Sequence, residues 1–268
     1  MINRRTTPVI VFAVSLYILV LAVGLRLKNL SWLTGSQPQF QRVGWEPPDR
    51  AAIPADSKGD SIRLGEQIFD DTPIYAPSHT GGKLSCSSCH AAHGMQPYAS
   101  PMVGLPKLFP MFNKRAGHVI SLQDRIQECF VRSENGTPLD YGGREMKAIV
   151  DYIEWLSQPS AKPYEGRGLI ALPELKPNAD HGSAVYASQC AGCHGSNGQG
   201  EWPNPPLWGP KSFNDGAGMH GIPKMAAFVQ HNMPANRMGN LTPQAAYDVS
   251  AFIHNQPRPA FNSEYAHF

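Results

Sequence analysis

The chain has 268 residues, of which 16% are charged, and its 23 basic and 21 acidic residues give a formal net charge of +2. Domains that bind nucleic acid are usually far more basic, so nucleic acid is not an expected partner. The 25 glycines and 25 prolines predict many loops, while an apolar content of 41% is sufficient for folded domains.

An uncharged run from Pro8 to Leu25 follows Arg4 and Arg5 near the N-terminus. As a helix this run is about 27 Å long, close to the thickness of the hydrocarbon core of a bilayer. We therefore predict an N-terminal transmembrane helix within a membrane anchor over residues 1–33, with the arginines in the cytoplasm and the bulk of the chain exported. A cleaved signal peptide is the alternative, because Ala22-Val23-Gly24 resembles a small-residue cleavage site.

Two copies of the pattern C-x-x-C-H follow, at 86–90 and 190–194. In c-type cytochromes the two thiols form thioether bonds with a haem, and the histidine binds its iron. A zinc site or a thioredoxin-like pair does not predict a histidine after both pairs. We therefore predict two covalently bound c-type haems. The attachment residues are Cys86, Cys89, Cys190 and Cys193, and the iron ligands are His90 and His194.

Each motif lies between two predicted helices, in an order that repeats along the chain. An amphipathic stretch precedes each motif, at 64–69 and 182–186, and a terminal helix follows it, at 145–157 and 243–253. The predicted fold is mainly α-helical, with two tandem cytochrome c domains after the anchor. The predicted boundaries are a proline-rich tether at 34–60, a first domain at 61–157, a linker at 158–178 and a second domain at 179–268.

Each haem iron also needs a second axial ligand, or an open position, and this choice sets its potential. In the second copy, Met233 precedes the terminal helix, where single-haem cytochromes c usually place this ligand. Cys129 follows His90 at the same sequence distance as Met233 follows His194, so we predict Cys129 as the ligand of the first iron. The alternatives are Met95, Met102, Met111 and His93 in the first copy, and Met219, Met225 and Met238 in the second.

This choice of ligands predicts a direction for the electrons. A thiolate lowers the potential of a haem and a methionine raises it. Electrons are therefore expected to pass from the first haem to the second.

Cys129 is the odd fifth cysteine, and it lies in a basic stretch at 114–136. If residues 123–130 are helical, Arg125 lies one turn before Cys129 on the same face. Lys114, Arg115, His118 and Arg132 are close in sequence. Arginines in such a cluster stabilise a thiolate and grip oxyanions through forked hydrogen bonds, although each could instead pair with a haem propionate or face solvent. We expect Arg125 together with Cys129 to be functional.

These residues resemble the dihaem thiosulfate dehydrogenases. The resemblance rests on both C-x-x-C-H motifs and on R-I-x-x-C-F-x-R-S-x-N-G at 125–136, P-P-L-W-G-P at 205–210, F-N-D-G-A-G-M at 213–219 and H-N-M-P at 231–234. It implies oxidation of two thiosulfate ions to tetrathionate and two electrons, which some members run in reverse. It also implies that Cys129 is the catalytic sulfur as well as a haem ligand, that Arg115 and Arg125 bind substrate, and that Met233 binds the second iron. Some members exchange that methionine for a preceding lysine, but here the position is Asn232, so no exchange is expected.

The predicted anchor gives a location, which departs from the usual soluble periplasmic forms of the family, and the resemblance suggests a mechanism. The haem domains are expected in the bacterial periplasm, held at the inner membrane by the anchor with the N-terminus in the cytoplasm. Thiosulfate is expected to dock on Arg115 and Arg125 while its sulfane sulfur meets the Cys129 sulfur as that residue leaves the iron. A small cytochrome or a membrane electron-transfer complex is the expected acceptor. The alternatives are a membrane-tethered dihaem electron carrier without substrate chemistry, and an enzyme for another sulfur anion.

Overall fold

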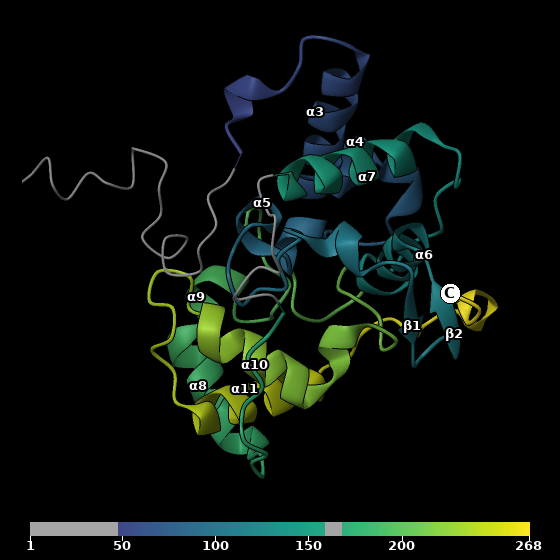
Figure 1. Cartoon of the computed structure of the whole chain (residues 1–268). Helices are drawn as coiled ribbons and strands as arrows, with labels where there is room; N and C mark the ends of the chain where they lie inside the picture. The colour runs from purple at the N-terminus through teal and green to yellow at the C-terminus, as the bar shows by residue number, and fades with distance from the viewer. Residues whose placement is uncertain (1–47, 159–167) are drawn as a thin grey trace, which may run out of the picture. The chain divides into compact units, whose positions relative to one another are not determined.

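The structure is a computed structural model that describes residues 48–158, the first half, and residues 168–268, the second half (Figure 1). These residues are mainly helical, and the described residues include one short two-stranded sheet, which belongs to the first half. The predicted transmembrane helix within residues 1–33 lies outside the described residues. Within the described ranges, no helix has the length and apolar character needed to cross a bilayer.

The first half surrounds the first C-x-x-C-H motif. Its first elements are η2 (Arg50–Ala52), α3 (Ser57–Asp70), α4 (Thr72–Tyr75), η3 (Pro77–His79), η4 (Cys86–Ser88) and α5 (Ala91–Gly94). They are followed by η5 (Leu105–Leu108), the strands β1 (Met111–Asn113) and β2 (His118–Ile120), α6 (Leu122–Glu128), the π-helical turn η6 (Cys129–Ser133) and α7 (Arg144–Ser157). Helix α3 begins inside the expected tether at 34–60, and Ile53 is buried in the first core. The packed chain therefore starts earlier than its proline-rich composition suggests.

Helices α3 and α7 cross each other and form the frame of the first half (Figure 1). Asp56 begins α3 by accepting hydrogen bonds from the backbone of Lys58 and Gly59, which satisfies amides that a helix start leaves free. At the crossing, a Cβ on Gly65 would lie 2.0 Å from the carbonyl oxygen of Ala148, so only glycine lets the two backbones come this close. The apolar stripe of α7 faces this contact. Its buried members are Met146, Ile149, Ile153 and Leu156.

The second half repeats this arrangement. Its elements are α8 (Ala179–Gln189), α9 (Ala191–His194), η7 (Gly218–His220), α10 (Ile222–Asn232), α11 (Pro243–His254) and η8 (Ser263–Tyr265). Helices α8 and α11 cross at Gly182, where a Cβ would lie 2.0 Å from the carbonyl oxygen of Asp248. Thr242 caps α11 through the amide of Ala245. The matching glycine crossings show that the internal repeat seen in the sequence is structural.

Hydrogen bonds connect the two halves around η6. The side-chain amide of Asn214 donates to the carbonyl of Val131 at 2.9 Å and to Asn135 Oδ1 at 3.1 Å. The backbone amide of Lys83 donates to the carbonyl of Lys211 at 2.9 Å. The turn that begins at Cys129 is therefore held from both halves.

Candidate functional site

A cavity of about 430 Å³ lies in the first half, and the first C-x-x-C-H motif lines it. Cys86 and Cys89 are free thiols. Burial raises the pKa of Cys86 well above its usual range and that of Cys89 to about 12, so both remain neutral. The rest of the wall is largely apolar and includes Phe69, Met102, Leu105, Phe109, Ile126 and Ile153. Two neutral thiols facing an apolar cavity fit a porphyrin attached through thioether bonds.

The two histidines of the motifs are oriented by the same device. His90 Nδ1 lies 2.6 Å from the carbonyl oxygen of Ser100, and His194 Nδ1 lies 2.9 Å from that of Pro205. A carbonyl that accepts a hydrogen bond from Nδ1–H leaves the unprotonated Nε2 as the metal-binding atom, which is the usual outer-shell arrangement at metal-ligating histidines. Burial lowers the pKa of His90 to about 4 and also lowers that of His194, so both rings are neutral at pH 7 and available as ligands.

The second motif lies where α8 ends and α9 begins. Cys190 is the C-cap residue of α8 and packs against the second core. Cys193 and His194 lie in the short helix α9 that follows. Burial raises the pKa of Cys190 to about 11, so this thiol is also neutral in the absence of a haem. The residues of both motifs thus fit two c-type haems.

Cys129 lines the same cavity as His90. It starts the turn η6, directly after α6, and Arg125 lies one helical turn earlier, with Nη1 3.3 Å from the Cys129 Sγ. Buried Gln127 fixes this segment, because its side-chain amide exchanges two hydrogen bonds with the backbone of Leu139, at 2.7 and 2.8 Å. The predicted pairing of Arg125 with Cys129 is therefore present.

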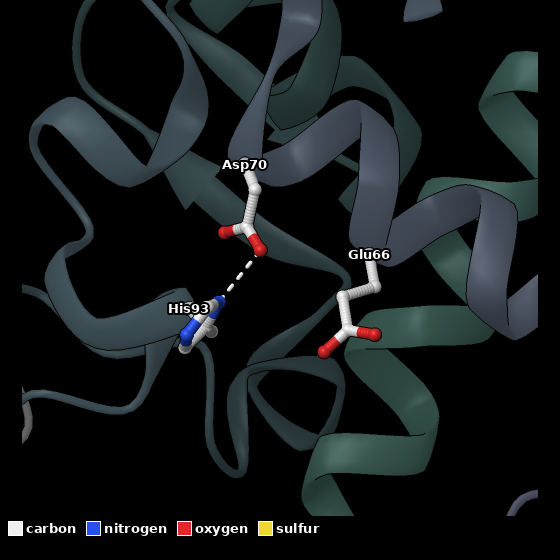
Figure 2. A group of neighbouring side chains, drawn as sticks. All are labelled: Glu66, Asp70 and His93. Carbon is white, nitrogen blue, oxygen red and sulfur yellow. Dashed lines mark hydrogen bonds and ion pairs between the residues drawn. The ribbon is translucent and has the colours of Figure 1, made fainter. Parts of the chain in front are cut away.

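Only some of the alternative ligands predicted for the first iron line this cavity. Met102 and Met111 line it, whereas Met95 and His93 are not among the described residues of its wall. The His93 ring is held by Asp70, with Nδ1 2.6 Å from Oδ2, and Figure 2 shows this pair beside Glu66. These three side chains place potential metal-binding atoms within 4.8 Å of one another, but Arg50 already binds Glu66 at 2.7 Å. Each carboxylate of the group therefore already has a partner, and the contact between His93 and Asp70 connects α5 to α3.

The four methionines of the second half differ in exposure. Met233 ends α10 and is half-buried against the second core, as is Met219. Met225 is fully buried in that core, and Met238 is exposed. Asn232, which precedes Met233, directs its side-chain amide to the carbonyls of Tyr98 and Phe228. Met233 and Met219 thus remain the half-buried candidates for the second iron.

Cationic side chains lie around Arg125. Arg115 stands in the turn of the β1–β2 hairpin, where its backbone amide donates to Asn113 Oδ1 at 2.8 Å. The Asn113 side chain donates in turn to Glu128 Oε2 at 3.0 Å, and Arg125 forms an ion pair with that same oxygen at 3.3 Å. Partial burial, and then repulsion by Arg115 and Arg125, lowers the pKa of Lys224 in the second half. The cations of the site therefore come from both halves.

Some residues of this arrangement have no signal in the sequence. Asn113 belongs to an unremarkable segment, and only the folded hairpin brings it to Glu128, which lies three residues after Arg125 on α6. Lys224 and Asn214 lie in the other half of the chain, far from Cys129 in sequence. The motif F-N-D-G-A-G-M at 213–219 did mark the position of Asn214, but not its contact with η6.

Fold and site together define a dihaem cytochrome c. A family model described as the SoxA/TsdA cytochrome c domain matches residues 73–160, and the Cytochrome c model matches residues 179–257. The thiosulfate dehydrogenase of Psychrobacter arcticus is 38% identical over 79% of this chain and 68% of its own length. That of Allochromatium vinosum is 37% identical over 80% of this chain and 84% of its own length.

A solved structure agrees with these relatives. The thiosulfate dehydrogenase TsdBA from Marichromatium purpuratum, in its as-isolated form, superposes with a TM-score of 0.76 at 34% identity. The match covers 80% of this chain and half of the length of that chain. The present chain belongs to the thiosulfate dehydrogenase family. It is an oxidoreductase with two covalently bound c-type haems, as the sequence predicts.

Proposed function

We propose that the chain oxidises two thiosulfate ions to one tetrathionate ion and two electrons, with Cys129 as the reacting sulfur. The observation that supports this most is the Arg125 guanidinium, 3.3 Å from Sγ, beside the cavity that His90 lines. A guanidinium at this distance stabilises a thiolate and offers further donors to an oxyanion. The relatives named as thiosulfate dehydrogenases support thiosulfate as the anion.

The reaction divides into two steps at Cys129. In the first, the Cys129 thiolate and the sulfane sulfur of a thiosulfate dianion form an S–S bond, and two electrons leave. In the second, the sulfane sulfur of another thiosulfate attacks the sulfur bound to Sγ, the Sγ–S bond breaks, and its electron pair returns to Cys129 as thiolate. The product is tetrathionate, and no proton is consumed or released. Arg125 and Arg115 reduce the repulsion among these anions.

The bound haems supply two one-electron acceptors for the first step. We assign His90 and Cys129 to the first iron, and His194 and Met233 to the second. Thiolate ligation lowers a haem potential and methionine ligation raises it, so the electrons pass from the first haem to the second. They then leave to an external acceptor, a small cytochrome or a membrane electron-transfer complex.

The proposal includes a location. A helix over the uncharged run from Pro8 to Leu25 holds the chain at the bacterial inner membrane, with its N-terminus in the cytoplasm. The haem domains then lie in the periplasm. Protease accessibility in spheroplasts, compared with that in lysed cells, tests this placement.

The test of the reaction is the absorbance of the oxidised holoprotein after addition of thiosulfate alone. Native protein is expected to become reduced and to release tetrathionate, which ion chromatography quantifies. Cys129→Met keeps a sulfur that can bind iron but cannot form the S–S bond, so it is expected to retain two haems by intact mass and to remain oxidised. Dithionite reduces both proteins and shows that their haems are competent.

Two results would contradict the proposal. If Cys129→Met is reduced by thiosulfate as quickly as native protein, Cys129 is not the reacting sulfur. If native protein stays oxidised with thiosulfate and is reduced only by another redox protein, the chain is an electron carrier.

A further inference from the structure

Lys224 belongs to the second half, yet it lies near the Cys129 site. It is in the first turn of α10 and is exposed. Its ammonium folds over Gly218, where a Cβ would lie 3.2 Å from Lys224 Nζ. Gly218 begins η7, and η7 contacts η6, the turn that starts at Cys129. The second half thus brings a flexible cation to the edge of the site.

The charges around Cys129 do not balance within the protein. Arg115 and Arg125 both repel the Lys224 ammonium, and the buried carboxylate of Glu128 attracts both Lys224 and Arg125. Glu128 forms an ion pair with Arg125 alone. Among the described residues, no carboxylate lies within ion-pair distance of Arg115 or Lys224. Glu128 thus matches Arg125, whereas Arg115 and Lys224 have no carboxylate partner among the described residues, and a bound dianion would supply the charge that these two cations lack.

Arg125 and Lys224 occupy different parts of this cluster. Arg125 is bound to the Cys129 sulfur and to Glu128. Lys224 interacts more strongly with Arg115 than with Arg125, and packing around its ammonium together with both repulsions lowers its pKa. An anion between Arg115 and Lys224 would relieve this repulsion while leaving the contact between Arg125 and sulfur intact.

We propose that Lys224, with Arg115, binds the second thiosulfate dianion, so that the second half of the chain completes the substrate site. This inference rests on the proposed function. After the first step, Cys129 holds an anionic S–S–SO₃ group, and a second dianion must approach it against like charge. Lys224 offsets that charge as the incoming sulfane sulfur attacks, the Sγ–S bond breaks, and tetrathionate forms.

The test compares Lys224→Met, Lys224→Arg and Lys176→Met in the full-length holoprotein. Lys176 is an exposed lysine of the second half and is the matched control for loss of one positive charge. Lys224→Met is expected to raise the KM for thiosulfate about tenfold, the effect of losing one charged hydrogen bond. It should also accumulate the Cys129 adduct, seen by intact mass as one added S₂O₃ unit. Lys224→Arg is expected to restore turnover, and Lys176→Met to behave as native protein.

Each outcome bears on a different claim. A Lys224→Met protein with native KM and no accumulated adduct overturns the inference. A Lys224→Met protein that cannot form the adduct at all places Lys224 at the first anion and overturns the assignment to the second. Native protein that neither forms an adduct nor is reduced by thiosulfate removes the proposed function itself.

Discussion

The side-chain amide of Asn214 in the second half donates a hydrogen bond of 2.9 Å to the carbonyl of Val131, two residues after Cys129. Asn214 is buried, and its backbone amide donates to the carbonyl of Arg132. One residue of the second half therefore satisfies two successive carbonyls of the turn that starts at Cys129. Docking of the halves and placement of the sulfur depend on the same contacts.

This contact predicts that Asn214→Ala is destabilising. The change leaves the buried carbonyl of Val131 without its side-chain donor, so we expect a loss of about 1–3 kcal/mol in the free energy of unfolding. Urea denaturation of the holoprotein measures it. Asn240→Ala, at an exposed asparagine of the same half, is the control and should stay within about 0.5 kcal/mol of native protein. Equal stability of the two variants would show that Asn214 does not hold the halves together.

A change at Arg125 is expected to lower activity without affecting haem incorporation. Its Nη1 contacts both the Cys129 sulfur and Glu128, which leaves the other guanidinium nitrogens as donors for an oxyanion, and a lysine ammonium lacks this planar set of donors. We expect Arg125→Lys to lower kcat/KM for thiosulfate about 100-fold with both haems retained. Steady-state kinetics and the haem absorbance check the two parts. Arg144→Lys, at an exposed arginine, should leave both unchanged. A kcat/KM equal to that of native protein in Arg125→Lys would show that the guanidinium of Arg125 is not needed for the reaction.

The sequence was sufficient to predict features that depend on neighbouring residues. The C-x-x-C-H motifs, the terminal helices and the position of Arg125 on the face of Cys129 all follow from short spacings. The hairpin β1–β2 and the site of Asn214 were not predictable in this way. The strands of the hairpin have only three residues each, too few for a clear alternation of apolar residues, and the partners of Asn214 are distant in sequence. The carbonyl partners of His90 and His194 were likewise hidden, because any backbone carbonyl is chemically equivalent before folding.

The two helix crossings predict that Gly→Ala is destabilising at the crossing glycines and not at an open position. In an open helix, Gly→Ala stabilises by about 1 kcal/mol. At Gly65 and Gly182 the added Cβ would lie 2.0 Å from a carbonyl oxygen, so the helices would have to separate. We expect Gly182→Ala to cost about 3 kcal/mol in unfolding free energy and to reduce haem incorporation. Gly142→Ala is the control, because Gly142 lies outside both C-x-x-C-H motifs and its added Cβ would meet only Asp140 Oδ1, at 4.0 Å. Urea denaturation and the ratio of haem to protein measure the two effects. Equal values in Gly182→Ala and the control would contradict the prediction.

The pair of His93 and Asp70, drawn in Figure 2, predicts a pH-dependent contribution to stability. The hydrogen bond that His93 donates to Asp70, opposed by partial burial, raises the pKa of His93 above its usual value of 6.5. A raised pKa in the folded state means that the pair stabilises the protein fully below pH 6.5 and loses this contribution as the pH rises through the folded value.

His93→Asn should therefore lower the free energy of unfolding by about 0.5–1 kcal/mol at about pH 5.5 and by less at about pH 8.5, because the pair is partly exposed. Urea denaturation at both pH values measures the difference. Asp70→Asn should give the same pH dependence, and the double variant should add little to either single change, since each removes the same interaction. A loss that is equal at both pH values, or that grows with pH, would show that the charged form of His93 does not stabilise the fold.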